Sequence, residues 1–332
     1  MRRSTRTFGL AALVLLGLAL PLAAETPAAI ARAFGSLSLG EPQHFEGLTV
    51  IPLLGRLLAS RGCVTLEQAL ERQWLRIEEK DGGSVPEVWV TNRSDQNVFL
   101  MGGEILSGAR QDRIVRQDVL VGPRRKRLAV PVYCVEQGRW GFTTERFGSE
   151  KNLGTYKLRA KARAGGPQGQ SEVWAEVSSA NEQAGVHSST GAYQDAYRDE
   201  RTARRVRELE RRLADLARSQ PLAVGAVVGL GDSIVSLDLF GDPSLFRELW
   251  PKILKSTALA ARGGPARVAQ GQAAGLLDLL AHADYRAGET VDLGSALEFR
   301  DARWEAGALL SEGSLLHLAA FPRESAEEGW LE

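Results

Sequence analysis

The sequence has few histidines and cysteines, and it lacks several short motifs that are typical of catalytic and metal sites. It holds four histidines, two cysteines and two methionines in 332 residues. The motifs Gly-x-x-x-x-Gly-Lys-Ser/Thr, His-Glu-x-x-His, Cys-x-x-Cys and Gly-x-Ser-x-Gly are all missing. The histidines, His44, His187, His282 and His317, are too scattered to form a zinc-ligand pattern. We therefore expect no metal site and no cofactor.

The two cysteines, Cys63 and Cys134, are too few for a fold held together by several disulfides. A bridge between them could form only in an oxidising compartment outside the cytoplasm. Cys134, however, lies in the apolar run from Val130 to Val135, where a free thiol behaves as a small buried side chain. The sequence leaves both states open and favours a free, buried Cys134.

Charge of one sign is not in excess either. Lys and Arg together number 41, as do Asp and Glu. Nucleic-acid-binding proteins usually carry a basic face. The two basic clusters, at 124–127 and 198–212, lie at an expected hairpin tip and among interleaved glutamates, which is typical of solvated surface. We therefore expect no nucleic-acid partner.

One apolar run stands out, and it follows an arginine-rich start. It extends from Phe8 to Leu20 and ends in a Pro-Leu-Ala-Ala sequence before Glu25. The run is shorter than the roughly 18 residues that span a bilayer. This pattern predicts a signal peptide at 1–24 and an extracytoplasmic protein, periplasmic or secreted. The remaining chain would carry 38 basic and 41 acidic residues and no transmembrane segment.

Local patterns predict an α+β fold with a β-rich, sandwich-like N-terminal half (25–148). Strands are expected at 88–91 and 98–101, on either side of a polar turn. Strands at 115–121 and 128–135 flank another polar turn and are expected to form a hairpin. Between 65 and 75, apolar residues at helical spacing follow Thr65, which predicts a capped helix.

The C-terminal half (172–322) is expected to be helix-rich and to contain a small sheet. The preceding segment, 149–171, is polar and glycine-rich, and we interpret it as a mobile crossover. The acidic tail at 323–332 is expected to be frayed. Helices are predicted at 172–182, 192–219, 243–261 and 265–283, and strands at 224–228, 234–239, 290–299 and 315–321.

The densest polar sequence lies in two segments, Gly102 to Arg113 and Cys134 to Trp140. Alternation along the strand places Glu136 on the same face as apolar residues, so that its carboxylate approaches a buried environment. A buried carboxylate requires a cation or hydrogen-bond donors. Arg113, Arg139 and Gln111 lie in the same two segments and could supply them. The candidate site residues are Glu104, Gln111, Arg113, Glu136, Arg139 and Trp140.

Two interpretations of this set are open. In the structural one, arginines and carboxylates fasten two strands together, and Trp140 is a core aromatic. In the functional one, the residues line an open cleft. Glu104 or Glu136 then acts as a general base or ligand acceptor, while Arg113 and Arg139 bind an anionic group with two hydrogen bonds each.

Four motifs resemble a known family: Gly-Gly-Glu-Ile-Leu-Ser-Gly-Ala-Arg-Gln-Asp-Arg (102–113), Pro-Val-Tyr-Cys-Val-Glu-Gln-Gly-Arg-Trp (131–140), Ser-Glu-Val-Trp (171–174) and Asp-Leu-Phe-Gly (238–241). Together they resemble the ARG and Rhodanese-Phosphatase-superfamily-associated Protein domain, over roughly Phe34 to Phe321. That name records association with ADP-ribosylglycohydrolase and rhodanese-phosphatase proteins and no activity. The resemblance implies that the candidate residues form one unit, because they are the polar positions of the matching motifs.

The favoured function is an exported binding module that recognises a small polar or anionic ligand, or a protein partner, through the Glu/Gln/Arg/Trp set. One alternative is a hydrolase-like enzyme with a carboxylate base and arginine charge stabilisation. Another is a purely structural, envelope-associated domain. Binding is favoured because hydrolases more often show an obvious nucleophile, metal set or histidine. Cys134 beside Glu136 is the one nucleophile-like arrangement, and its apolar strand disfavours a thiolate.

Overall fold

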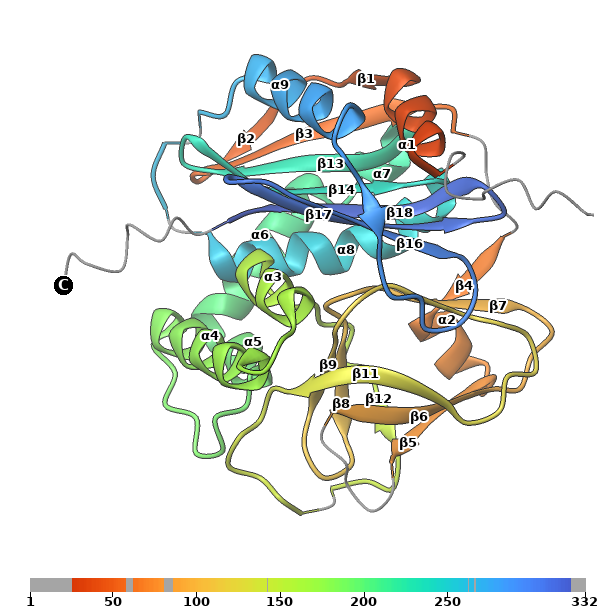
Figure 1. Ribbon diagram of the computed structural model, residues 1–332. Helices are drawn as coiled ribbons and strands as arrows, with labels where there is room; N and C mark the ends of the chain where they lie inside the picture. Colours follow the sequence, from red (N-terminus) through yellow and green to blue (C-terminus); the bar gives the residue numbers. More distant parts are fainter. Residues whose placement is uncertain are drawn as a thin grey trace, which may run out of the picture.

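The computed structural model describes residues 26–323, except 58–61, 81–85, 142, 262 and 266. The expected signal peptide, and the expected tail beyond residue 323, lie outside the described residues. The α+β class and the β-rich N-terminal half are confirmed (Figure 1). Three sheets and several groups of helices make up the described chain.

The largest sheet has nine antiparallel strands and draws on both ends of the chain. Its order is β1-β3-β13-β14-β18-β17-β16-β15, with β2 paired to β3. It is therefore larger than the small sheet expected, because the first three strands join those of the C-terminal half. The strands are β1 (Leu37–Leu39), β2 (Gln43–Phe45), β3 (Leu48–Gly55), β13 (Ala223–Leu230), β14 (Ser233–Phe240), β15 (Arg286–Ala287), β16 (Ser295–Arg300), β17 (Trp304–Ser311) and β18 (Ser314–Pro322).

Helices cover both faces of this sheet (Figure 1). Along β3, alternation directs Leu48 and Val50 into one hydrophobic core and Ile51 and Leu53 into the other. The first core includes residues of α6 (Glu200–Leu213), α7 (Leu216–Ser219) and α8 (Pro243–Ala260). The second includes residues of α1 (Thr26–Gly35) and α9 (Gln270–Ala281). Burial on both faces explains the nearly continuous apolar sequence of the central strands.

The other two sheets and the short helix α2 (Leu66–Glu71) share a third core. This agrees with the sandwich-like expectation for the N-terminal half. The three-stranded sheet has the order β10-β7-β4 and the six-stranded sheet the order β12-β8-β9-β11-β6-β5. Their strands are β4 (Cys63–Thr65), β5 (Leu75–Glu79), β6 (Glu87–Asn92), β7 (Asn97–Leu100), β8 (Ile105–Gly108), β9 (Arg113–Val115), β10 (Val119–Val121), β11 (Leu128–Cys134) and β12 (Phe147–Gly148).

Three helices, α3 (Tyr156–Ala164), α4 (Gly169–Ala184) and α5 (Gln194–Arg198), pack on the outer side of the six-stranded sheet through a fourth core. Tyr133 and Val135 enter this core, whereas Val130 and Val132 enter the third one. The chain around β11 therefore separates two cores. Its C-terminal end carries the candidate residues that follow Cys134.

The mobile crossover expected at 149–171 is wrong, because α3 lies inside it and α4 begins at Gly169. Thr155 caps α3 by accepting a hydrogen bond from the Leu158 amide. Leu158, Arg159 and Ala162 are buried. The apolar signal was weak because a charged residue, Arg159, occupies part of the buried face.

The hairpin expected from 115–121 and 128–135 is only partly present. β9 pairs with β11, but β10 leaves that sheet and pairs with β7. The strands on either side of the 92–97 turn likewise separate, since β6 pairs with β5 and β11 while β7 lies in the three-stranded sheet. Sequence alternation identified the strands but not their partners.

Other element boundaries differ for local reasons. Thr65 forms the expected capping box with Gln68, but the helix ends early and Leu75 begins β5. The single helix expected at 192–219 is divided into α5, α6 and α7, with Asp199 capping α6. The helix expected from 265 starts at Gln270. Strand β17 was not predicted.

The cysteines are not bridged: Cys63 and Cys134 are both free thiols, and Cys134 is buried, as the favoured interpretation expected. Among the residues that the structure describes, no helix combines the length and apolar character needed to cross a bilayer.

Candidate functional site

The six candidate residues divide among three places. Gln111, Glu136 and Arg139 meet beyond the end of β11. Arg113 extends from the same region into the interior, and Glu104 belongs to a separate charge cluster. Trp140 lies on the surface. The set is therefore not one convergent constellation, although all its members lie on or beside the 102–113 and 131–140 segments.

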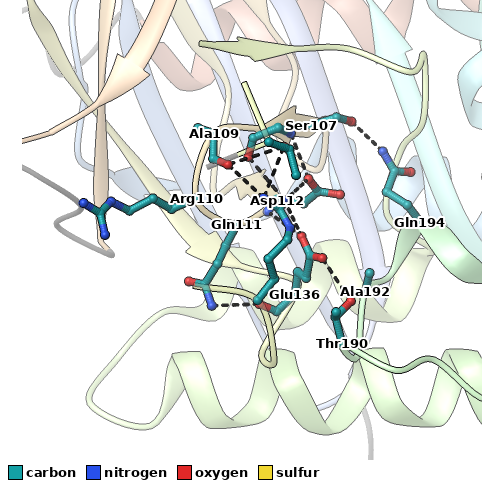
Figure 2. Close-up of polar contacts among 12 residues, drawn as sticks. Ser107, Ala109, Arg110, Gln111, Asp112, Glu136, Thr190, Ala192 and Gln194 are labelled. Atoms are coloured by element: carbon teal, nitrogen blue, oxygen red, sulfur yellow. Dashed lines mark hydrogen bonds and ion pairs between the residues drawn. The ribbon is translucent and has the colours of Figure 1, made fainter. Parts of the chain in front are cut away.

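The Glu136–Arg139 pair is the centre of the first place. Arg139 donates from Nη2 to Glu136 Oε2 at 2.5 Å and to Asp112 Oδ1 at 3.2 Å. The Asp112 amide donates to the same Glu136 oxygen at 3.2 Å, and Thr190 Oγ1 donates to Glu136 Oε1 at 3.0 Å. Figure 2 shows Asp112 and Thr190 approaching Glu136 from opposite sides. With Glu136 only 5% exposed, the pair closes on itself.

The two carboxylates of this cluster differ in their proton affinity. Burial alone would raise the pKa of Glu136, but hydrogen bonds from Arg139, the Asp112 amide and Thr190 lower it below its usual range. Burial raises the pKa of Asp112 to about 6, against the hydrogen bond from the Gly108 amide and with the help of the negative charge on Glu136. The pKa of Asp112 is thus shifted upward and that of Glu136 downward, so Asp112 binds a proton more readily than Glu136.

The same cluster fixes the described residues, 137–141 and 143–146, of an exposed loop (the 137–146 loop). Arg139 Nη1 donates to the Ala109 carbonyl at 2.8 Å, as does the Thr143 amide at 3.0 Å. The Ala109 amide in turn donates to Thr144 Oγ1 at 2.9 Å. Ala109 is fully buried and has a φ of 47°, which is uncommon for a residue other than glycine. Ala109, whose backbone is strained, therefore contacts the loop through several hydrogen bonds.

Further hydrogen bonds tie the cluster to the connection between α4 and α5. The Gly138 amide donates to the Thr190 carbonyl at 2.6 Å, and the Tyr193 amide donates to the Val135 carbonyl at 2.9 Å. Above Thr190 and Ala192 in Figure 2, Gln194 donates to Ser107 Oγ at 2.6 Å. The loop thus rests on strands and helices at once.

Gln111 and Arg113 act within the interior. Gln111 Nε2 donates to the Glu136 carbonyl at 2.9 Å, so it supports the backbone and leaves the carboxylate to Arg139. Arg113 is fully buried and donates from Nη1 to the Gln111 carbonyl at 3.1 Å, while its Nη2 lies 3.6 Å from Glu79 Oε2. Arg113 therefore pairs with Glu79 of β5, a partner that the sequence did not suggest.

Trp140 lies on the surface. The structural interpretation, which expected it in the core, is wrong on this point. It is 55% exposed, and it and Leu222 are the exposed large hydrophobic residues of the described chain. The guanidinium of Arg110 lies over its ring, 5.5 Å from the centroid. In Figure 2 the Arg110 side chain points away from the Glu136 cluster. Trp140 and Arg110 thus form an outward-facing pair on a fixed base.

Glu104 belongs to a buried cluster with Lys252 of α8. Lys252 contacts Glu104 and lies 2.5 Å from Glu67 of α2, while the Met101 amide donates to Glu104 Oε2 at 3.0 Å. Burial raises the pKa of Glu104 to about 7, although the attraction of Lys252 opposes this shift. This cluster joins α8, below the large sheet, to the β-rich half.

The adjacent glycines contact a second buried cluster, which the sequence did not reveal. Gly102 donates from its amide to Asp118 Oδ1 at 2.8 Å and accepts from Arg159 Nε at 3.3 Å. Gly103 has a φ of 100°, and a Cβ there would come within 2.4 Å of the Arg159 side chain. Glycine at 103 is therefore required both by the backbone and by the closeness of Arg159.

His317 of β18 lies at the centre of that cluster. Its Nδ1 is 2.7 Å from Asp118 Oδ2 and its Nε2 is 3.2 Å from Asp238 Oδ1. Because both nitrogens face carboxylates, the imidazolium form is favoured. Burial would lower the pKa of His317, but the two aspartates raise it above its usual value. Asp238 is the first residue of the Asp-Leu-Phe-Gly motif, so this motif supplies a carboxylate to the buried cluster.

These residues give little support to a cysteine nucleophile or to a metal site. Burial raises the pKa of the Cys134 thiol, which disfavours a thiolate nucleophile. Within the described ranges, no group of three or more His, Cys, Asp or Glu side chains is arranged to hold a metal ion. What the arrangement does is hold the 137–146 loop, and with it the Trp140–Arg110 pair, in a fixed position.

Together, the fold and the site define an α+β protein in which one glycine-rich segment contacts buried charge clusters at one end and supports a surface loop at the other. The family model described as the ARG and Rhodanese-Phosphatase-superfamily-associated Protein domain matches residues 36–321, and the chain belongs to this family. Comparison with curated proteins and with solved structures found no match.

Proposed function

We propose that this protein is an exported binding module whose 137–146 loop contacts a protein partner through Trp140 and Arg110. One observation carries the proposal: a tryptophan that is 55% exposed follows directly after Arg139, which pairs with the buried Glu136. Tryptophan and arginine are enriched among the residues that dominate interface energies. The candidate set then has two roles, with Trp140 touching the partner and Glu136, Arg139 and Gln111 supporting it.

Preorganisation supports this function. A loop that must become ordered on binding loses part of its interaction energy as conformational entropy. Here Arg139, Thr143 and Thr144 all bond to Ala109, so these loop residues are already held in place. The stacked Arg110 also restricts the Trp140 ring. The surface therefore suits a partner segment that offers an apolar group.

Binding is better supported than hydrolysis. A general base needs a carboxylate that can reach a substrate. Both oxygens of Glu136 already accept hydrogen bonds from protein groups. Glu104 is buried against Lys252. The carboxylates of the candidate set are thus engaged within the protein.

The test is site-specific photo-crosslinking in the organism that makes the protein. A crosslinking residue at the exposed position 137 should capture a partner, whereas the same residue at position 222, in place of the exposed Leu222, should not. With the purified partner, Trp140→Ala should weaken binding by about 2 kcal/mol, or roughly thirtyfold.

Leu222→Ala is the matched control, because it removes an exposed apolar side chain elsewhere. Trp140→Ala should also leave the free energy of unfolding within about 0.5 kcal/mol of the unmodified protein, as expected for a surface position. Equal capture at positions 137 and 222, or partner affinity unchanged by Trp140→Ala, would contradict the proposal.

A further inference from the structure

A basic groove lies where the turns 92–97 and 122–127 of the β-rich half meet. The first turn joins β6 to β7, and the second joins β10 to β11. The buried Asn92 connects them, because its Nδ2 donates to the Gly122 carbonyl at 2.9 Å and its backbone amide donates to the Arg125 carbonyl at 2.9 Å. The two turns are therefore fixed relative to each other.

Cations outnumber acids in the lining of this groove. The groove has a volume of about 650 Å³, and its walls come from β5, β6 and both turns. The charged residues of the lining are Arg76, Arg93, Arg124, Lys126, Arg127 and Glu78. A concave surface lined by one sign of charge concentrates ions of the opposite sign.

Two of the five cations are compensated by carboxylates. Arg76 pairs with Glu78 inside the groove, and Arg124 donates two hydrogen bonds of 2.7 Å to Asp95. The other three cations are exposed and form no ion pair with any residue that the structure describes. They are Arg93, Lys126 and Arg127. The groove therefore keeps an excess of positive charge after its ion pairs are counted.

Arg127 is held in place without losing its charge. Its guanidinium lies over the Trp89 ring of β6, 4.9 Å from the centroid. Its φ of 46° and the φ of Arg124, 53°, are uncommon for residues other than glycine, and such conformations persist where the surrounding structure supports them. Asp292 supports this turn by accepting a hydrogen bond from the Gly122 amide at 2.9 Å. The turn thus presents its cations from a fixed backbone.

We propose that this groove binds an acidic peptide segment of a partner protein, whose carboxylates pair with Arg93, Lys126 and Arg127. A guanidinium forms two parallel hydrogen bonds to a carboxylate, and clusters of arginines are a recurring means of recognising acidic motifs. The groove is open, which suits an extended segment better than a small molecule, since small-molecule sites enclose most of the ligand surface. The described residues of the 137–146 loop do not line it, so this inference is independent of the function proposed above.

An anionic membrane surface fits the groove less well than a peptide. Segments that bind such surfaces combine cations with apolar side chains that enter the lipid. The exposed large hydrophobic residues of the described chain are Trp140 and Leu222, and neither lines the groove. The observations therefore favour the peptide.

The test is fluorescence anisotropy of a labelled peptide of alternating Asp and Glu, titrated with the purified protein at low salt. This peptide should bind with a Kd below about 100 µM, and a peptide of alternating Asn and Gln should not bind measurably. A groove variant that combines Arg93→Gln, Lys126→Gln and Arg127→Gln should raise the Kd at least about tenfold, because it removes the three unpaired charges.

Two further variants make the result specific. A control that combines Arg204→Gln, Arg207→Gln and Arg211→Gln makes the same change in net charge on exposed positions of α6, and should leave the Kd unchanged. Glu78→Gln releases Arg76 from its ion pair, so it should lower the Kd by about threefold. A folding defect does not produce a change of that sign.

Sedimentation with phosphatidylglycerol vesicles separates a peptide site from a lipid site, and the vesicles should not retain the protein. Three results would overturn the inference. They are the absence of binding by the acidic peptide, equal weakening by the groove variant and the α6 control, and vesicle binding that the groove variant abolishes.

Discussion

Arg159 and Asp238 form a buried two-point ion pair that joins α3 to the centre of the large sheet. Arg159 Nη1 donates to Asp238 Oδ2 at 3.0 Å, and Nη2 donates to Oδ1 at 2.6 Å. The two side chains are 4% and 1% exposed. Arg159 and Asp118 also bond to Gly102, so the pair links the glycine-rich segment to β14 and β18.

Breaking this pair should be strongly destabilising. Asp238→Asn leaves Arg159 and His317 buried without their shared carboxylate, so the free energy of unfolding should fall by about 3–5 kcal/mol. Chemical denaturation measures this. The control is Asp95→Asn, which breaks an equally bidentate but fully exposed pair with Arg124 and should hardly change stability. Similar losses in both variants would mean that the buried cluster has no special role.

The same cluster predicts a pH dependence with a definite sign. The pKa of His317 is raised in the folded protein, so its contribution to stability is complete below the unfolded value of about 6.5 and is lost as the pH rises through the folded pKa. The stability difference between the unmodified protein and His317→Gln should therefore shrink as the pH rises above about 6.5. Denaturation at several pH values measures it, and a difference that grows with pH would contradict the assignment.

Lys252 should matter more than Glu104. Lys252→Met leaves Glu104 and Glu67 close together and buried without a cation, so we expect a loss of about 3–5 kcal/mol. Glu104→Gln leaves Lys252 paired with Glu67, and because burial raises the pKa of Glu104 to about 7, a neutral amide is tolerated at a cost of about 1 kcal/mol. Thermal or chemical unfolding compares them. The reverse order would show that Glu104 is the essential charge.

Glu136 and Arg139 should behave as a coupled pair. Glu136→Gln and Arg139→Ala each remove the ion pair between these residues, so the double variant should be more stable than the sum of the single effects predicts. The coupling energy is expected to be about 1–3 kcal/mol. A double-mutant cycle by denaturation measures it. Strictly additive effects would mean that the loop is held by its backbone hydrogen bonds alone.

Export predicts a defined N-terminus. If the signal peptide at 1–24 is removed, the extracytoplasmic protein should begin near Glu25. Mass spectrometry of the intact purified protein tests this. Recovery of a chain that still starts at Met1, or recovery from the cytoplasm alone, would contradict the prediction.

The sequence was most informative where structure depends on neighbours along the chain. The helix cap at Thr65, the neighbouring strands β13 and β14, and the helical residues of α6 each involve residues only a few positions apart. The pairing of Glu136 with Arg139 could also be predicted from the sequence, because they are three residues apart and Glu136 continues an apolar strand face. Such signals are visible in one sequence without an alignment.

Long-range pairs could not be predicted in this way. Lys252 is 148 residues from Glu104, and His317 is 199 residues from Asp118. Neither spacing nor composition links residues so far apart. The same limit explains why Glu104 was grouped with Glu136, since adjacent motifs were taken to converge in space. Arg159 was missed because a buried arginine weakens the apolar pattern that identifies a helix.

The place of β3 in the large sheet has a consequence for how the chain folds. β3 lies near the start of the described residues, yet its neighbours in the sheet are β1, β2 and β13, and β13 begins only at Ala223. Closing so long a loop makes folding slow. The central strands can therefore pair only after most of the chain has been synthesised. Until then the large sheet is incomplete, so the complete fold forms late, as is required of a chain that is threaded through a membrane before it folds.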